Sequence, residues 1–197
     1  MTKNIVLASR NARKLAELQD LLGALDYRLR LLSDFSEEQA EEHAPSFVEN
    51  ALLKARHAAK LSGLPALSDD SGIEVDALNG APGVHSARYA GANASDADNN
   101  AKLLDALRDV SGHRRTARYV CVLALVRQPY DPVPVLAQGE WRGQLLESPR
   151  GAGGFGYDPL FWVAEHGKTA AELPAALKNR LSHRARAAAA LLQALRG

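Results

Sequence analysis

Two long apolar runs near the middle of the sequence limit the folds that this chain can adopt. Residues 117–126 are rich in Val and Leu, and residues 133–145 follow them after the segment Pro129-Tyr130-Asp131-Pro132. Such runs favour β-strands, and the turn-forming segment between them allows a long hairpin. Near the N-terminus, the short apolar run 5–9 leads directly into a helix that Asn11 can cap. A hairpin set among alternating strands and helices predicts an α/β fold with a mixed sheet.

The remaining elements follow from apolar spacing and from helix-capping residues. Three further helical segments are predicted over residues 46–61, 95–107 and 174–195. Two further short strands are predicted over residues 27–32 and 160–163. Ser182 either divides the last helical segment in two or lies within one continuous helix. No linker marks a boundary, so residues 1–197 are predicted to form a single domain.

The charges are balanced, with 24 Lys and Arg against 23 Asp and Glu for a formal net charge of +1. No global positive field therefore indicates a nucleic-acid polymer or an anionic membrane as the main partner. Cys121 is the single cysteine, which excludes an intrachain disulfide and a thiolate metal cluster. No run reaches the ~18 apolar residues of a spanning helix, so we expect a cytoplasmic protein.

The first predicted helix begins with basic residues, where the helix dipole favours the opposite charge. Arg13 and Lys14 follow the Asn11 cap, and Ser9 lies just before it. Free backbone N–H groups, an Asn cap and two cations form an arrangement that binds phosphate. The alternative is that both side chains point outward into water.

Basic residues at a possible helix start also occur near the C-terminus. His183 and Arg184 follow the possible cap Ser182, and Lys178 lies just before it. If a helix begins here, it offers a second positively charged helix start. If the helix is continuous, these residues belong to a basic, solvated face.

Two adjacent carboxylates, Asp69 and Asp70, end one strand-like run and precede another. In an extended backbone they point to opposite faces, so only one of them looks into a given site. Like charges this close raise each other's pKa unless a cation or hydrogen bonds intervene. Because Mg²⁺ takes one or two carboxylates with water and substrate phosphate, Asp70 with one acid from Glu41-Glu42 predicts a magnesium site. The alternative is an ordinary Asp-Ser-Gly turn.

Residues 151–158 are rich in glycine and carry two aromatic side chains. They formally match G-x-G-x-x-G, but no strand precedes them and Pro159 prevents a crossover helix, which excludes a dinucleotide fold. Glycines let the backbone approach a flat ligand closely, while Phe155 or Tyr157 offers a ring on which a nucleobase stacks. The alternative is that these rings pack in the core.

Several motifs occur in a fixed order along the chain. They are Ser9-x-Asn11-x-x-Lys14, Phe47-x-Glu49-Asn50-Ala51-x-x-Lys54-Ala55, Ser68-Asp69-Asp70-Ser71-Gly72, Gly80-Ala81-Pro82-Gly83, Ser86-Ala87-Arg88-Tyr89, Gly153-Gly154-Phe155-Gly156-Tyr157-Asp158-Pro159 and Ser182-His183-Arg184. Together they resemble the inosine triphosphate pyrophosphatase family over residues 4–196. The resemblance implies an elongated mixed β-sheet flanked by helices, with two lobes and a central substrate cleft. It also implies a homodimer and a Mg²⁺-dependent hydrolase that converts ITP, dITP or XTP into the monophosphate and pyrophosphate and so removes them from the nucleotide pool.

The resemblance also implies roles for individual residues. Asp70 is the expected metal-bound proton acceptor, and Glu41 is the expected second metal ligand, with Glu42 as the neighbouring alternative. The expected substrate-binding residues are Ser9, Asn11, Lys14, Ser71, Phe155, Gly156, Tyr157, Asp158, Lys178, His183 and Arg184. Donors from His183, Arg184 or Lys178 to a 6-oxo group would reject adenine, since each unpaired donor costs ~1–3 kcal/mol.

Two other functions are compatible with these residues. A related pyrophosphatase would act on modified pyrimidine triphosphates, and a nucleotide-sensing module would bind ITP with Mg²⁺ without turnover. Pyrophosphate release across a panel of triphosphates separates the three.

Overall fold

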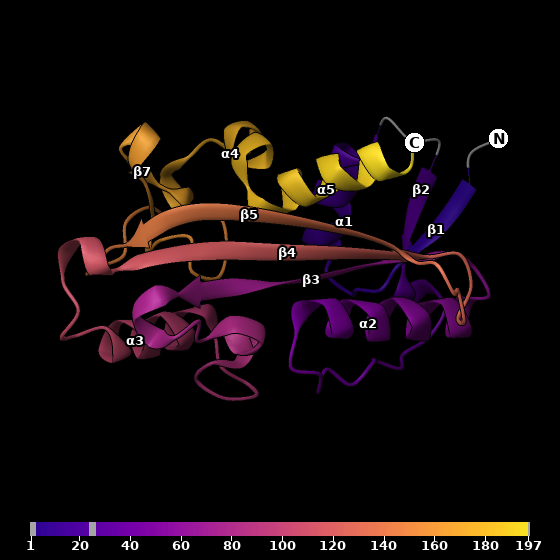
Figure 1. Ribbon diagram of the computed structural model, residues 1–197, viewed down its shortest axis with the longest axis horizontal. Coiled ribbons are helices and arrows are strands. Elements are labelled where there is room, and N and C mark those ends of the chain that lie inside the picture. Colours follow the sequence, from indigo (N-terminus) through magenta and orange to yellow (C-terminus); the bar gives the residue numbers. More distant parts are fainter. Residues whose placement is uncertain (1–2, 24–26, 197) are drawn as a thin grey trace. The chain divides into compact units, whose positions relative to one another are not determined.

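The computed structural model describes residues 3–23 and 27–196, apart from the side chain of Arg13. Its seven strands form one sheet in the order β2-β1-β3-β4-β5-β6-β7 (Figure 1). They are β1 Lys3–Leu7, β2 Tyr27–Leu31, β3 Ala66–Val75, β4 Thr116–Val126, β5 Val135–Leu145, β6 Phe161–Val163 and β7 Lys168–Thr169. β2 and β3 pair with β1 in parallel, whereas β6 pairs antiparallel with β5 and β7. The predicted mixed α/β sheet is confirmed.

In the described part of the chain, five α-helices accompany the sheet. They are α1 Ala12–Leu21, α2 Phe47–Ser62, α3 Asp96–Ala106, α4 Ala175–Leu181 and α5 His183–Ala194. Short 3₁₀ turns are η1 Leu32–Asp34, η2 Asp76–Leu78, η3 Gly83–Arg88, η4 Gly112–Arg114, η5 Ala164–His166 and η6 Ala170–Glu172. Ser46 and Ser95 accept N-cap hydrogen bonds as predicted. Ser182 has an extended backbone and separates α4 from α5, so the continuous-helix alternative is wrong.

The chain divides into two compact units. Unit 1 comprises Met1–Asp70, Cys121–Gly139 and His183–Gly197, and unit 2 comprises Ser71–Val120 and Glu140–Ser182. β3, β4 and β5 each contribute residues to both units. Each unit has its own cluster of buried apolar side chains, so each has a core of its own.

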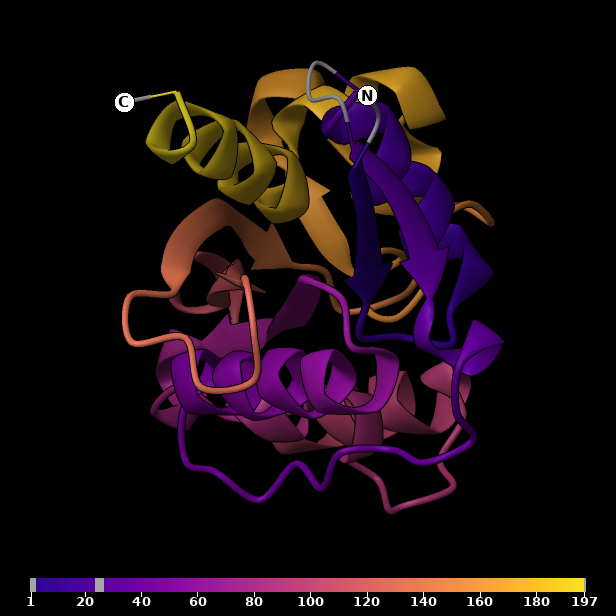
Figure 2. The same ribbon diagram turned by 90° about the vertical axis from the view of Figure 1, so that its right-hand side faces the viewer.

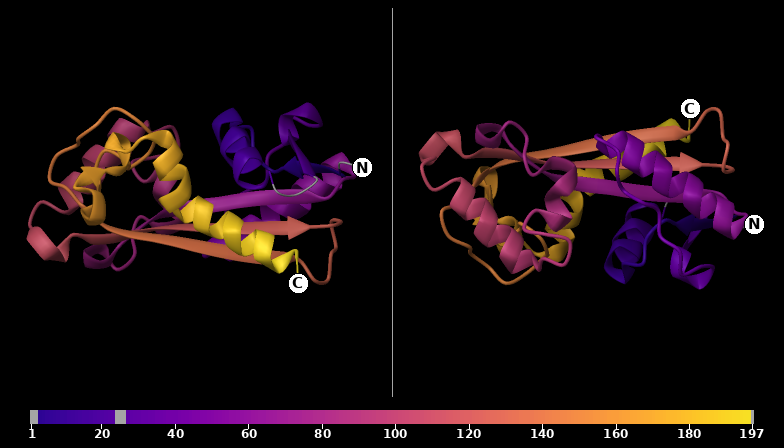
Figure 3. Two further views of the ribbon diagram at one scale, coloured as in Figure 1. Left: turned by 90° about the horizontal axis from the view of Figure 1, so that it is seen from above. Right: turned by 90° about the horizontal axis from the view of Figure 1, so that it is seen from below.

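Unit 1 is layered. α2 lies on one side of its strands, and α1 and α5 lie together on the other, as the views from the side, above and below show (Figures 2 and 3). The buried face of α2 consists mainly of alanines, and the Ser68 hydroxyl of β3 donates to the Ala51 carbonyl at 2.6 Å. On the other side, any Cβ at Gly139 would collide with the backbone of His183 and Ala187. Small residues therefore bring both helix layers close to the strands.

Unit 2 has an aromatic core, with α3 and α4 on opposite sides of its strands (Figure 1). The rings of Tyr119 and Phe161 lie 4.7 Å apart, and Trp141 lies 5.1 Å from Phe161. Arg115 is buried and donates to four carbonyls, those of Leu107, Val110, Leu145 and Leu146. This one side chain therefore fixes the end of α3 to the end of β5.

The structure differs from the sequence prediction at several elements, and β7 was not predicted at all. Asp69 and Asp70 do not separate two strands, because both residues lie within the continuous strand β3. The first strand spans 3–7 rather than 5–9. The second strand of the central hairpin begins at Val135, because Asp131 accepts from Arg127 and from the backbone N–H of Val133 and so holds the turn.

Candidate functional site

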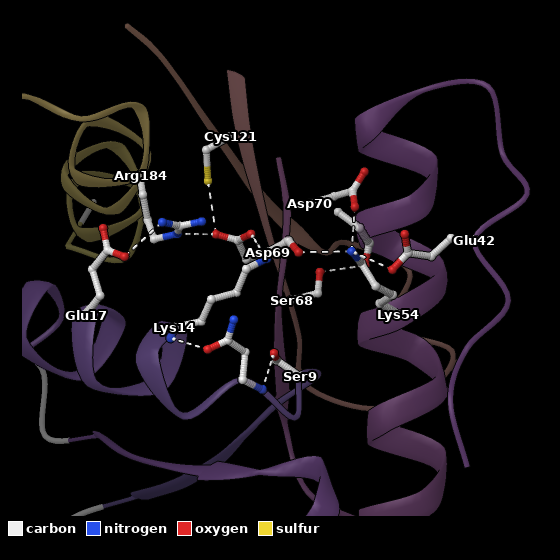
Figure 4. Close-up of polar contacts among 12 residues, drawn as sticks. Ser9, Lys14, Glu17, Glu42, Lys54, Ser68, Asp69, Asp70, Cys121 and Arg184 are labelled. Carbon is white, nitrogen blue, oxygen red and sulfur yellow. Dashed lines mark hydrogen bonds and ion pairs between the residues drawn. The ribbon is translucent and has the colours of Figure 1, made fainter. Parts of the chain in front are cut away.

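Unit 1 carries a group of charged side chains around β3, which we call the β3 cluster: Lys14, Glu17, Glu42, Lys54, Asp69, Asp70 and Arg184. Asp69 and Asp70 project to opposite sides of the strand, as predicted. Figure 4 shows Lys14, Arg184 and Cys121 converging on Asp69, whereas Asp70 faces Lys54. The two neighbouring acids therefore have different partners and cannot replace each other.

Asp69 is buried between two cations. Its carboxylate accepts from Lys14 Nζ at 2.8 Å and from Arg184 Nε at 2.6 Å, and Cys121 Sγ lies 3.4 Å away. Burial alone would raise the pKa of Asp69, but Arg184 and Lys14 hold it well below its ordinary value. Burial raises the pKa of the Cys121 thiol, so the thiol stays protonated and acts as a donor. At neutral pH Asp69 is thus an ionised anchor for two basic side chains.

Asp70 lies in a different electrostatic environment. Lys54 Nζ of α2 is 2.5 Å from its carboxylate, 3.0 Å from the Asp69 carbonyl and 3.2 Å from the Glu42 carboxylate. Burial raises the pKa of Asp70, Lys54 opposes that rise, and the charges of Glu42 and Asp69 add to it. Burial lowers the pKa of Lys54, but Asp70 and Glu42 more than offset this, so its ammonium stays charged. A carboxylate with a raised pKa is a better proton acceptor near neutral pH.

The acids around Lys54 are of the kind that bind a divalent cation, and in this structure they are directed at the Lys54 ammonium. Two carboxylates and one backbone carbonyl direct oxygen atoms at a point charge, and these are the ligand types that Mg²⁺ takes. Within residues 3–23 and 27–196, no group of three or more His, Cys, Asp or Glu side chains could hold a metal ion. Mg²⁺ bound to a nucleotide needs only one or two carboxylates, so Asp70 and Glu42 are the candidate ligands.

The second acid in this environment is Glu42. Its carboxylate shares Lys54 with Asp70 and contributes to the raised pKa of Asp70. The sequence left the choice between Glu41 and Glu42 open, with Glu41 preferred from the resemblance. The contacts of Glu42 favour it, whereas the role of Glu41 stays a prediction.

The turn before α1 forms as the sequence indicated. Ser9 Oγ accepts from the Asn11 N–H at 3.0 Å, and Asn11 Oδ1 accepts from the Lys14 N–H at 3.2 Å, so Asn11 caps the helix. The Lys14 ammonium is paired with Asp69, so for Lys14 the outward-pointing alternative is wrong. The side chain of Arg13 lies outside the described part of the chain.

Arg184, in the first turn of α5, is only 2% exposed. Besides Asp69, it binds Glu17 of α1 at 2.8 Å. Burial would lower its pKa, but Asp69 and Glu17 raise it. This guanidinium therefore connects α5 to α1 and β3. The neighbouring His183 is also buried.

Unit 2 carries the glycine-rich segment and Lys178. Phe155 is 39% exposed, and the ammonium of Lys178 lies 4.8 Å from the centre of its ring. Asp158 is buried, forms an ion pair with Lys178, and accepts from the Phe155 N–H at 2.9 Å. Gly154 lies against this carboxylate with a positive φ of 72°, and a Cβ there would meet Asp158. Asp158 therefore fixes both Phe155 and Lys178.

Tyr157 has the opposite environment to Phe155. It is buried, and its hydroxyl donates to the Ser86 carbonyl at 2.8 Å. Burial raises the pKa of this hydroxyl. The core-packing alternative thus applies to Tyr157, and the ring available for stacking is that of Phe155. Ser71, the other predicted contact in unit 2, is half-buried on β3.

Comparisons with known proteins identify the family of this chain. The model of the Ham1 family matches residues 5–194. This chain belongs to the Ham1 family. A protein of Pseudomonas aeruginosa named dITP/XTP pyrophosphatase is 58% identical to the chain, over 98% of the chain and 97% of the relative. The relative of that name from Vibrio cholerae is 50% identical, over 98% and 96%. The predicted family resemblance is confirmed.

Solved structures of Ham1-family proteins have the same fold. A HAM1 protein from Coxiella burnetii superposes with a TM-score of 0.92 at 49% identity, over 98% of both chains. A dITP/XTP pyrophosphatase from Mycobacterium abscessus gives a TM-score of 0.79 at 46% identity, over 96% of this chain and 98% of that chain. Within the residues described for our Ham1-family chain, no helix combines the length and the apolarity that crossing a membrane requires.

Sequence reasoning gave no role to two members of the β3 cluster in this Ham1-family chain, Lys54 and Glu17, although Lys54 stands in one of the ordered motifs. Lys54 lies on α2 among the buried alanines 51, 55 and 58, and a lone cation beside such an apolar face was a usable signal for a buried ion pair. No comparable signal marked Glu17, because its partner Arg184 is 167 residues away.

Proposed function

We propose that this chain is a nucleoside triphosphate pyrophosphatase that converts noncanonical purine nucleotides, ITP, dITP and XTP, into the monophosphate and pyrophosphate. The observation that carries the proposal is the arrangement of Asp70, Lys54 and Glu42 beside β3. The names of relatives that are 50% and 58% identical support the same reaction.

The β3 cluster provides the chemistry for a triphosphate. Mg²⁺, when held by Asp70 and Glu42, would neutralise phosphate charge and polarise a phosphoryl oxygen. Asp70, whose pKa burial raises, orients a water molecule and accepts its proton. The water attacks the α-phosphorus in line, and pyrophosphate leaves. The start of α1, with Arg13, supplies positive charge for the departing group, while the N–H groups of Asn11 and Lys14 hold the turn itself.

The residues of unit 2 provide the chemistry for a purine base. The exposed ring of Phe155 offers a stacking surface, and Lys178 is a donor close to it. Lys178 is our first choice for recognition of the 6-oxo group, because its ammonium, although paired with Asp158, lies beside the exposed Phe155 ring, whereas Arg184 is buried between Asp69 and Glu17. His183, Ser71 and Gly156 stay proposed substrate contacts, whereas Tyr157 and Asp158 act by supporting the others.

The test is pyrophosphate release from a panel of triphosphates with and without Mg²⁺. We expect rapid release from ITP, dITP and XTP, slow release from ATP, and none after Mg²⁺ is removed. Faster turnover of modified pyrimidine triphosphates would instead identify the related pyrimidine enzyme. Tight Mg²⁺-dependent binding of ITP without release would identify a binding module.

We also propose that the protein is a cytoplasmic homodimer, and light scattering in solution tests the dimer.

A further inference from the structure

One residue of the glycine-rich segment, Gly156, is held by two side chains of α3. Asp96 Oδ2 accepts from the Gly156 N–H at 2.7 Å, and Asn100 Nδ2 donates to the Gly156 carbonyl at 2.8 Å. Asp96 and Asn100 are four residues apart, so they lie on the same face of the helix. Both backbone polar groups of Gly156 are therefore bound to α3.

Neither contact serves the helix start itself. The capping box of α3 is formed by Ser95 and Asp98, whose hydroxyl and carboxylate exchange hydrogen bonds with each other's backbone. Asp96 is an additional acid in the same turn, with its carboxylate directed at Gly156. The start of α3 is thus complete without Asp96.

The orientation of Asn100 is fixed by the two carbonyls that its amide nitrogen contacts. Its amide nitrogen also donates to the Asp96 carbonyl at 2.7 Å, whereas its buried Oδ1 accepts no hydrogen bond within residues 3–23 and 27–196. An unsatisfied buried acceptor destabilises a protein. The amide directs its N–H groups at the carbonyls of Asp96 and Gly156, and a flipped amide would lose both hydrogen bonds.

Gly156 lies between an exposed and a buried aromatic residue. Its φ of 61° is a left-handed conformation that favours glycine, and a Cβ there would meet no atom within 4 Å. On one side, Phe155 presents its ring, with Lys178 near it. On the other side, Tyr157 is fixed in the core. The contacts from α3 therefore fix the backbone of Gly156, and this backbone sets the direction of the Phe155 ring.

The helix that holds Gly156 is itself firmly anchored in unit 2. Asn99 accepts from the Ala90 N–H at 2.8 Å and donates to the Ala87 carbonyl at 3.2 Å, and Leu103 is fully buried. A displacement of α3 would break these contacts together. α3 can therefore act as a rigid reference for the loop.

We propose that Asp96 and Asn100 are positioning residues that hold the Phe155 ring in the orientation needed to stack on the purine base. This inference rests on the proposed function, since it assigns Phe155 to the base. Neither side chain needs to touch the substrate. Their loss weakens base binding in the ground state and the transition state alike, while the chemistry at the phosphates continues.

The first experiment compares Asp96→Ala with Asp98→Ala, which removes the same charge from the same helical turn. We expect Asp96→Ala to raise KM for ITP about tenfold while kcat changes less than about twofold, as lost uniform binding requires. Inhibition by inorganic pyrophosphate, which has no base, should be unchanged. Asp96→Asn should restore most of the affinity, because its amide oxygen can still accept from Gly156. Asp98→Ala should lower thermal stability and leave KM unchanged.

A double-mutant cycle tests whether Asp96 acts through Phe155. In a Phe155→Ala background, Asp96→Ala should change KM for ITP by less than about twofold, because the ring that it positions is gone. Full additivity would overturn the proposal. The proposal would also be overturned if Asp96→Ala weakened inhibition by pyrophosphate as much as it raised KM for ITP, because that result would indicate a general distortion of the protein.

Hydrogen exchange without nucleotide separates this proposal from the proposed function. Asp96→Ala and Asn100→Leu should speed exchange of the amides at 156–157, and Asp98→Ala should not. Faster exchange with an unchanged KM would overturn the positioning role alone. Wild-type protein that neither cleaves nor binds ITP would end the proposed function, and the positioning role with it.

Discussion

At the scale of single residues, Asp69 and Asp70 are adjacent and chemically alike, yet their neighbours give them opposite properties. Arg184 and Lys14 hold the pKa of Asp69 well below its ordinary value, against the effect of burial. Burial, with the charges of Glu42 and Asp69, raises the pKa of Asp70 against the effect of Lys54. Alternation along an extended strand allowed this division to be predicted. The partner cations could not be predicted, because they come from other elements.

Asp69 is expected to make the protein sensitive to acid. Because its folded pKa lies below its unfolded value of 3.8, the unfolded state binds the proton more readily. The contribution of Asp69 is therefore fully present above that value and is lost as the pH falls toward the folded pKa. We expect Asp69→Asn to lower the free energy of unfolding at pH 7 and to flatten its decline in acid, as measured by urea unfolding across pH. The control is Asp34→Asn at an exposed site, which should leave the decline in acid as steep as in wild type. An equally steep decline in Asp69→Asn would contradict this assignment.

Lys54 is expected to control the proton affinity of Asp70. Since Lys54 is the cation that lowers the pKa of Asp70, Lys54→Met should raise that pKa and move the acidic limb of the kcat/KM profile for ITP to higher pH. It should also cost ~2–4 kcal/mol of stability, because two partly buried carboxylates lose their partner. Lys60→Met, an exposed lysine of the same helix, is the matched control. An acidic limb that stays in place would show that Asp70 is not the titrating base.

At the scale of elements, helix starts were the most predictable features. Each predicted start has a polar residue just before the helix. A side-chain oxygen accepts a hydrogen bond from the first turn at Asn11, Ser46 and Ser95, and an extended backbone separates two helices at Ser182. β7 has two residues and no apolar pattern, so no sequence signal could mark it. The unbroken β3 was missed because two adjacent acids usually signal a turn, whereas here ion pairs on both sides allow the strand to continue.

Arg115 is expected to be essential for the packing of α3 against the end of β5. Arg115→Lys keeps the charge but cannot supply the four hydrogen bonds that the guanidinium donates to backbone carbonyls, so we expect a loss of ~2–4 kcal/mol in urea unfolding. The adjacent exposed Arg114 is the control, and Arg114→Lys should change stability by less than ~0.5 kcal/mol. Equal effects of the two substitutions would show that the buried hydrogen bonds of Arg115 are not decisive.

At the scale of the whole molecule, the chemical groups of the candidate site come from distant parts of the sequence. Arg184 reaches Asp69 across 115 residues, and Lys54 reaches Asp70 across 16. Local patterns predicted that Asp70, Lys14 and Phe155 are functional, because charge and glycine content are visible along the chain. They could not predict that Lys14 pairs with Asp69, or that α3 holds the segment with Phe155, since such contacts depend on tertiary structure.

The role of Asp70 is tested most directly by the initial rate of pyrophosphate release from ITP with Mg²⁺, in wild type and in Asp70→Asn. The amide keeps the shape of the side chain but can neither accept the proton nor hold the metal as a carboxylate does. We predict a loss of at least about a hundredfold in kcat, with a melting temperature that shows a folded protein. Asp105→Asn, at an exposed carboxylate on α3, should keep the wild-type rate. A folded Asp70→Asn protein that hydrolyses ITP at nearly the wild-type rate would contradict the account.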